Sequence, residues 1–141
     1  MVQGLDIENN RTDLERAAMK TAKHYLEEAN GQVKRITPQE AIQFHGDGTT
    51  LYIDVRDSSD IAKSGTIKGA VKIPRGFMEF AADDATPHFN GALNKNVRLC
   101  LVCGAGGQAA LAGKTLLEMG YKNVINIGGF SAWKDAGGPT E

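Results

Sequence analysis

A cysteine stands between an apolar run and a glycine-rich segment in this chain, in the sequence VRLCLVCGAGGQ at residues 97–108. The apolar run, residues 97–102, is typical of a strand buried on both faces. The helix-forming run AALA begins at Ala109. We therefore expect Cys103 to stand where a strand turns sharply into a helix.

Such a turn creates a binding place for negative charge beside the thiol. Glycines allow a tight loop whose backbone N–H groups converge on one point, and the helix adds unpaired N–H groups and the positive end of its dipole. A thiol in these surroundings reacts as the thiolate. We therefore expect Cys103 to be a nucleophile, with an anion-binding loop formed by Gly104, Ala105, Gly106, Gly107, Gln108 and Ala109.

Two phosphate-binding patterns overlap this segment, and each lacks a required part. Residues 104–109 fit the dinucleotide pattern G-x-G-x-x-G/A, but that fold needs an acidic residue closing the next strand. Here the next candidate strand, residues 123–127, has no acidic residue and is followed by glycine. The triplet Gly113-Lys114-Thr115 has Gln108 where a phosphate loop requires glycine. A nucleotide site is therefore not expected.

Two cysteine patterns also overlap it. Cys100 and Cys103 form C-x-x-C, but residues three apart on a strand point to opposite faces, so their sulfurs cannot bridge. Cys100 is expected to be a small buried core residue. A cysteine phosphatase loop requires an arginine six positions after the cysteine, where this chain has Ala109. The pattern therefore favours neither a redox pair nor a phosphatase.

Five short segments carry a resemblance to a known family: LYIDVR at 51–56, SGTIKGA at 64–70, VKIP at 71–74, CGAGGQ at 103–108 and NVINIGGFSAW at 123–133. In this order and spacing they resemble the rhodanese (sulfurtransferase) domain, from about residue 32 to the C-terminus. Thr66 stands where the family usually has histidine, and Gln108 where its loop often has arginine. The resemblance implies an α/β fold with an open, mostly parallel sheet and helices on both faces.

Alternating strand and helix patterns predict the same architecture. Strands are expected at residues 32–36, 51–55, 71–73, 97–102 and 123–127. Helices are expected after Thr37-Pro38, over 57–62, after Pro74, from Ala109 and near Trp133, with a loop over 83–94. Ligand sites in such sheets lie at the carboxyl ends of strands, which places Asp54 and Arg56 at the same edge as Cys103.

Residues 11–30 form one amphipathic pattern, predicted to be a single helix that ends at Gly31. The chain then divides into an N-terminal helical extension, residues 1–31, and a rhodanese-like domain, residues 32–141. We expect the apolar face of the helix, which includes Leu14, Tyr25 and Leu26, to shield one face of the domain. The alternative is a contact for a partner or a second subunit.

Composition excludes several classes of partner. The net charge of −1 leaves no strongly basic surface for nucleic acid or an acidic membrane. The first residues lack a secretory signal, and no apolar stretch approaches the roughly 20 residues of a membrane span. Two cysteines that cannot pair suit a reducing compartment. We predict a cytoplasmic protein without a cofactor or metal, in which His24, His45 and His88 are solvated.

The resemblance implies a sulfurtransferase or persulfide carrier. Cys103 would take sulfane sulfur from thiosulfate, a polysulfide or a persulfide, and pass it to cyanide or to the thiol of a small molecule or protein. Uncharged Gln108 makes thiosulfate a less favoured donor. We expect Asp54 and Arg56 to be a structural pair holding the loop, and Arg75 either to meet an anionic substrate or to be an ordinary surface arginine. A weakly active or inactive binding or sensing module is the alternative function.

Overall fold

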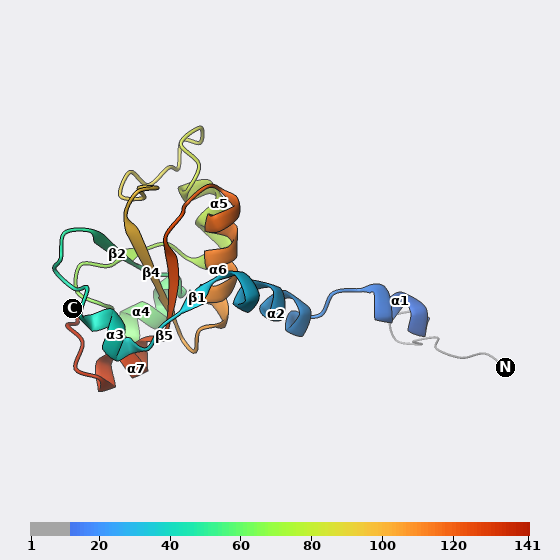
Figure 1. The fold of residues 1–141 in the computed structure, drawn as a ribbon, viewed down its shortest axis with the longest axis horizontal. Coiled ribbons are helices and arrows are strands. Elements are labelled where there is room, and N and C mark those ends of the chain that lie inside the picture. Colours follow the sequence, from blue (N-terminus) through green and yellow to red (C-terminus); the bar gives the residue numbers. More distant parts are fainter. Residues whose placement is uncertain (1–11) are drawn as a thin grey trace.

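The computed structural model describes residues 12–141, which form a sheet whose strands all run parallel (Figure 1). The predicted open, mostly parallel sheet is therefore confirmed. The strands lie in the order β1 (Lys34–Arg35), β5 (Val124–Gly129), β4 (Arg98–Cys103), β2 (Thr50–Asp54) and β3 (Val71–Lys72).

Helices cover both faces of this sheet, as predicted. They are α1 (Asp13–Ala18), α2 (Ala22–Gln32), α3 (Pro38–Ile42), α4 (Ser58–Ser64), α5 (Met78–Ala81), α6 (Gly107–Glu118) and α7 (Phe130–Asp135), with a 3-10 turn η1 (Arg75–Phe77) before α5. One core layer lies between the sheet and α5 and α6, and a second lies between the sheet and α3 and α7 (Figure 1). Within residues 12–141, no helix has both the length and the apolar character needed to cross a bilayer.

The central strand β4 separates the two cysteines. Leu101 and Cys103 face the layer under α5 and α6, whereas Cys100 and Val102 face the layer that contains Trp133. All of these side chains are buried. The predicted opposite orientation of the two thiols and the core position of Cys100 are therefore confirmed.

The N-terminal extension is helical, but the predicted single helix is wrong. Thr12 and Thr21 each accept a hydrogen bond from the backbone N–H three residues later, at Glu15 and His24, and each is part of a capping box. The helix α1 ends at Ala18, before extended backbone at Met19, and the second cap requires extended backbone at Thr21, after which α2 starts. The helix α2 passes through Gly31 and ends at Gln32. The predicted start at residue 11 lies outside the described residues.

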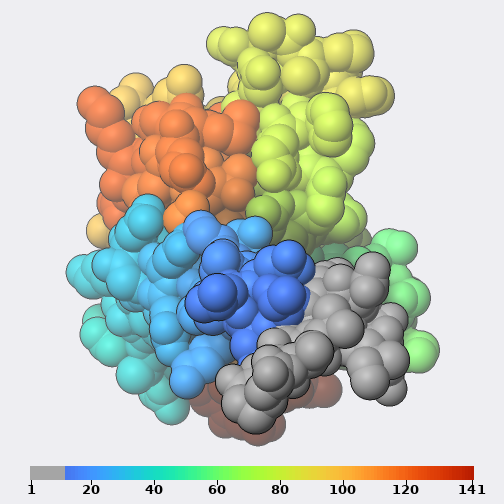
Figure 2. All heavy atoms as spheres, turned by 90° about the vertical axis from the view of Figure 1, so that its right-hand side faces the viewer, coloured from blue at the N-terminus to red at the C-terminus, as the bar shows by residue number. Residues whose placement is uncertain are grey.

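Only part of the extension packs on the domain. Figure 1 shows α1 away from the sheet, and Leu14 on it is 84% exposed. The expectation that Leu14 belongs to a packed face is therefore wrong, because the break at Thr21 puts it on a different helix from Leu26. The helix α2 does lie against α6 (Figure 2). The domain boundary at residue 32 stays a prediction.

A glycine sets the contact between the end of α2 and α6. A Cβ atom at Gly113 would lie 2.9 Å from Cγ1 of Val33, which follows α2, and 3.3 Å from Cγ1 of Val124 on β5. The glycine of the Gly113-Lys114-Thr115 triplet is thus a close-packing residue inside a helix, far from any strand-to-helix turn.

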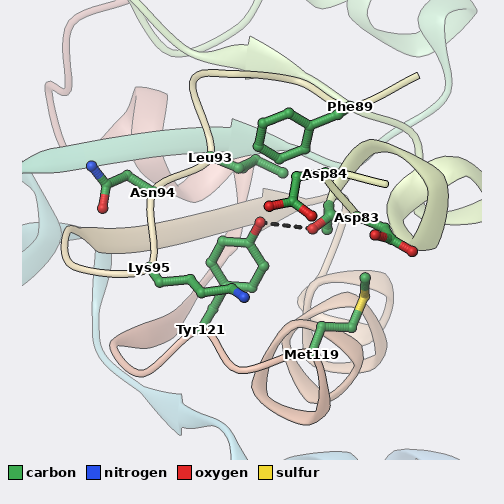
Figure 3. Close-up of a pocket in the computed structure, with 9 residues that line it drawn as sticks. Asp83, Asp84, Phe89, Leu93, Asn94, Lys95, Met119 and Tyr121 are labelled. Carbon is green, nitrogen blue, oxygen red and sulfur yellow. Dashed lines mark hydrogen bonds between the residues drawn. The ribbon is translucent and has the colours of Figure 1, made fainter. Parts of the chain in front are cut away.

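A pocket of about 510 Å³ opens at the end of the sheet where β4 and β5 begin (Figure 3). It is lined by Leu93 and Lys95, which precede β4, and by Tyr121, which precedes β5. The Tyr121 hydroxyl donates to the carbonyl oxygen of Ala82 at 2.9 Å. Because these residues lie at the amino ends of β4 and β5, the pocket is at the opposite edge from Cys103.

Replacing Gly113 with valine should lower the free energy of unfolding by about 1–3 kcal/mol, because the new side chain overpacks the contact with Val33. Gly31→Val, at an exposed position of α2 where an added Cβ would meet nothing within 4 Å, is the matched control for exchanging glycine for valine in a helix. Urea denaturation measures both variants. Equal losses would show that the contact does not require glycine.

Candidate active site

The sulfur of Cys103 accepts two backbone hydrogen bonds. The N–H of Gly106 lies 3.0 Å from Sγ, and that of Ala109 lies 3.4 Å from it. Gly106 has φ +103, which a residue with a side chain rarely adopts, and it caps α6. Gly107 and Gln108 already belong to the first turn of that helix. Two of the N–H groups in the predicted loop are thus brought to the sulfur.

The buried side chain of Asn126, on β5, forms hydrogen bonds that hold the turn between β4 and α6 in place. Its Nδ2 donates to the carbonyl oxygen of Gly106 at 2.8 Å, and its Oδ1 accepts from the N–H of Gly128 at 2.9 Å. A Cβ at Gly129 would collide with the carbonyl oxygen of Gly104, so glycine there lets β5 approach the loop. Sequence reasoning used Asn126 only to exclude a dinucleotide site and missed this contact.

A second residue that sequence reasoning missed is Arg35, on β1. Its Nη2 donates to the carbonyl oxygen of Ala105 at 3.3 Å, and its guanidinium lies beside Gly106 and Gly128. The contact joins positions 70 residues apart. No local pattern marks such a residue, and only the pairing of β1 with β5 brings it to the loop.

Asp54 and Arg56 form a buried network at the end of β2, the strand next to β4. Arg56 donates to both carboxylate oxygens of Asp54, to the hydroxyl of Ser64 at 2.9 Å and to the carbonyl of Gly65 at 2.9 Å. The hydroxyl of Thr66 donates to Asp54 at 2.7 Å. These contacts tie β2 to the end of α4, and the expected role of the pair in holding the active loop stays a prediction.

Arg75 lies beside the loop but is held by neighbouring side chains. Its Nη1 pairs with Glu79 at 3.1 Å, and its Nη2 donates to the Thr115 hydroxyl on α6 at 3.2 Å. With Gln108 it lines a pocket of about 510 Å³, whose opposite wall includes Leu26 of α2. The extension thus forms part of the surface next to the predicted loop.

The second cysteine offers no competing nucleophile. Burial raises the pKa of the Cys100 thiol to about 12. Its sulfur therefore stays protonated, and so weakly nucleophilic, at any pH near neutrality.

The three histidines have separate roles. The expectation that His45 is solvated is wrong, since it is half-buried against Tyr52 and Trp133, with Nε2 2.8 Å from the carbonyl oxygen of Lys68. His24 caps α2, and exposed His88 packs edge-on against a phenylalanine ring. In the part of the chain that the structure describes, no three acidic, cysteine or histidine side chains cluster as a metal site would require.

Asn126→Ala should lower the free energy of unfolding by about 1–3 kcal/mol, because it leaves the buried N–H of Gly128 without a partner and the carbonyl oxygen of Gly106 with only its bond from the Ala110 N–H. It should also speed hydrogen exchange at the N–H of Gly106, because the side chain no longer holds the carbonyl group of that residue. Asn123→Ala, exposed just before the same strand, is the control and should change little. Unchanged exchange in Asn126→Ala would contradict a role in holding the loop.

Known proteins similar to this chain point to one family. The family model of the "Rhodanese-like domain" matches residues 37–136. The chain is 37% identical over 91 residues to "Protein HIGH ARSENIC CONTENT 1, mitochondrial" of Arabidopsis thaliana. It is 31% identical over 81 residues to "Putative sulfur carrier protein YrkF" of Bacillus subtilis. These matches cover 61% and 57% of this chain and 53% and 39% of those proteins, so the chain spans about half of their length or less.

Solved structures are similar over most of the chain. A Rhodopseudomonas palustris protein of unknown function, described as a possible tyrosine phosphatase, has a TM-score of 0.81 at 36% identity, covering 87% of this chain and 96% of that one. The 30 kDa polysulfide-sulfur transferase homodimer of Wolinella succinogenes has a TM-score of 0.68 at 27% identity, covering 84% and 85%. The parallel sheet, the order of the sequence segments and the match over residues 37–136 agree, and the chain belongs to the rhodanese-like domain family.

Proposed function

We propose that this protein is a sulfurtransferase or persulfide carrier that moves sulfane sulfur through Cys103. The observation that carries the proposal is the pair of N–H groups, from Gly106 and Ala109, that donate to Sγ. Two relatives support it: the Wolinella protein is a polysulfide-sulfur transferase, and the Bacillus protein is named a sulfur carrier.

The chemistry consists of two displacements at sulfur. The Cys103 thiolate attacks the outer sulfur of the donor, the donor's sulfur–sulfur bond breaks, and the remainder leaves with the electron pair. Thiosulfate would release sulfite, and a polysulfide would release a polysulfide one atom shorter. The thiolate of the acceptor, or cyanide, then takes the sulfur from the Cys103 persulfide and restores the thiolate.

Backbone N–H groups suit both steps because negative charge stays on sulfur throughout. They stabilise the thiolate and the outer sulfur of the persulfide as an oxyanion hole stabilises oxygen. Nucleophile and leaving group are both anions, so neither step requires a general acid or base.

The groups near the loop favour sulfur donors that carry little negative charge. Gln108 is neutral, and Arg56 uses its guanidinium within the Asp54 network. The loss of a charge-assisted hydrogen bond is worth about 1.5–3 kcal/mol, or about one to two orders of magnitude in rate. We therefore place a polysulfide or a persulfide ahead of thiosulfate as the donor. The acceptor is a thiol of a small molecule or of a protein.

A non-catalytic binding or sensing module is the competing function, and phosphate ester hydrolysis is suggested for the Rhodopseudomonas relative by its description. Phosphate ester hydrolysis is disfavoured because Ala109 occupies the position of the arginine that a cysteine phosphatase uses. Loading of sulfur onto the protein separates the proposal from both.

Incubation with polysulfide should add one reducible sulfur atom to the intact mass. Cys103→Ser should abolish this gain, because the thiolate is the nucleophile. Cys100→Ser should retain it, since the Cys100 thiol has its pKa raised to about 12 by burial. Cleavage of p-nitrophenyl phosphate should be absent in all three proteins. A folded wild-type chain that gains no sulfur would establish the binding module instead.

Gly106→Ala should reduce the rate of sulfur loading at least about tenfold, because a left-handed backbone is strained for alanine and its Cβ would meet Arg35. Gly107→Ala is the matched control. A Cβ there makes only an ordinary contact, 3.5 Å from Cδ2 of Leu26, and the position needs no left-handed backbone. Stopped-flow loading with polysulfide measures both. Similar rates in the two variants would mean that the geometry of Gly106 does not govern the sulfur.

A further inference from the structure

Two glycines leave the space that the guanidinium of Arg35 occupies on the outside of the loop. A Cβ at Gly106 would lie 2.5 Å from Nη1, and a Cβ at Gly128 would lie 3.2 Å from Nη2. Both glycines have positive φ, +103 and +86. A side chain at Gly106 would displace the guanidinium, so the backbone that points an N–H at Cys103 also leaves the space that Arg35 occupies.

This cation lies close enough to act on the sulfur. The amide nitrogen of Gly106 is 3.0 Å from Sγ, and its Cβ position is 2.5 Å from the guanidinium. Standard backbone dimensions then place Nη1 no more than about 8 Å from Sγ. Arg35 is exposed, so solvent weakens its field, but the Gly106 turn rather than water lies between the guanidinium and the sulfur, and opposite unit charges at this distance still attract.

The other charged groups around the loop bond residues other than Arg35. On the β2 side, Asp54 bonds Arg56 within one buried network. On the η1 side, Arg75 pairs with Glu79. Glu40 lines the same small pocket as Arg35, but its carboxylate accepts from the N–H and hydroxyl of Thr37.

The described part of α6 and β5 adds no acidic group next to Cys103, and in residues 12–141 no carboxylate forms an ion pair with Arg35. Among the same residues, its guanidinium donates one hydrogen bond, to the neutral carbonyl of Ala105. In this part of the chain the positive charge beside the loop is therefore not paired with a carboxylate, although exposed Glu40 lines the same pocket.

We propose that Arg35 is a positioning residue of the active loop. Its charge, which lies outside the loop, favours the Cys103 thiolate and persulfide, whereas position 108 inside the loop holds the neutral Gln108. The inference rests on the proposed function for its biological purpose. Its physical content, a through-space effect on the thiolate, can be measured without any sulfur donor.

The test is the pH dependence of Cys103 alkylation by iodoacetamide, a neutral reagent that reports the thiolate fraction. Arg35→Gln keeps a hydrogen-bond donor but removes the charge, and should slow alkylation at pH 7 by about three- to tenfold and move its midpoint to higher pH. Arg35→Lys keeps the charge and should stay within about twofold of the wild type. Lys34→Gln removes a charge from the other face of the same strand and should change little.

Peptide mass spectrometry assigns the modification to Cys103, and circular dichroism verifies the fold of each variant. A midpoint in Arg35→Gln equal to that of the wild type would overturn the proposal. So would equal shifts in Arg35→Gln and Arg35→Lys, because the effect would then follow the shape of the side chain rather than its charge. Sulfur loading is scored separately: its absence in the wild type would refute the proposed function and leave the alkylation result standing.

Discussion

The turn from β4 into α6 depends on one residue that is bonded in two directions. The N–H of Gly106 donates to the sulfur of Cys103, while its carbonyl oxygen accepts from the buried amide of Asn126. Both bonds require the left-handed backbone that only glycine adopts without strain. The position of the sulfur thus depends on a residue that is held at both its N–H and its carbonyl group, and the surrounding strands place the groups that hold it.

The parallel sheet brings the clamping groups together. Asn126 comes from β5, which pairs with β4, and Arg35 comes from β1, which pairs with the other side of β5, so parallel crossovers bring both residues to the loop. On the other side, the network of Asp54, Arg56 and Thr66 fixes the end of β2. Since this network is buried and fully bonded, it stabilises the edge of the site without offering a cation to a substrate.

Local patterns were sufficient to predict most of this fold. The apolar run before Cys103, the glycines after it and the capping residues Thr37 and Pro38 each encode structure within a few positions, and those elements appear where predicted. The break at Thr21 was also local, a capping signal outweighed by the amphipathic pattern around it. The roles of Asn126 and Arg35 were beyond reach, because their contacts span 20 and 70 residues and depend on strand order.

The burial of Cys103, which is 1% exposed, bears on what can react there. A sulfane sulfur carries a single substituent and can approach a recessed thiolate end-on. The phosphorus of a phosphate ester carries four oxygens and needs a wider cradle with a cation to hold them. In the proposed mechanism the persulfide adds one sulfur atom to Sγ, so the sulfur that is transferred lies one bond farther from the buried backbone of Cys103. A narrow loop that binds sulfur through backbone N–H groups therefore suits the delivery of a single sulfur atom better than it suits phosphoryl transfer.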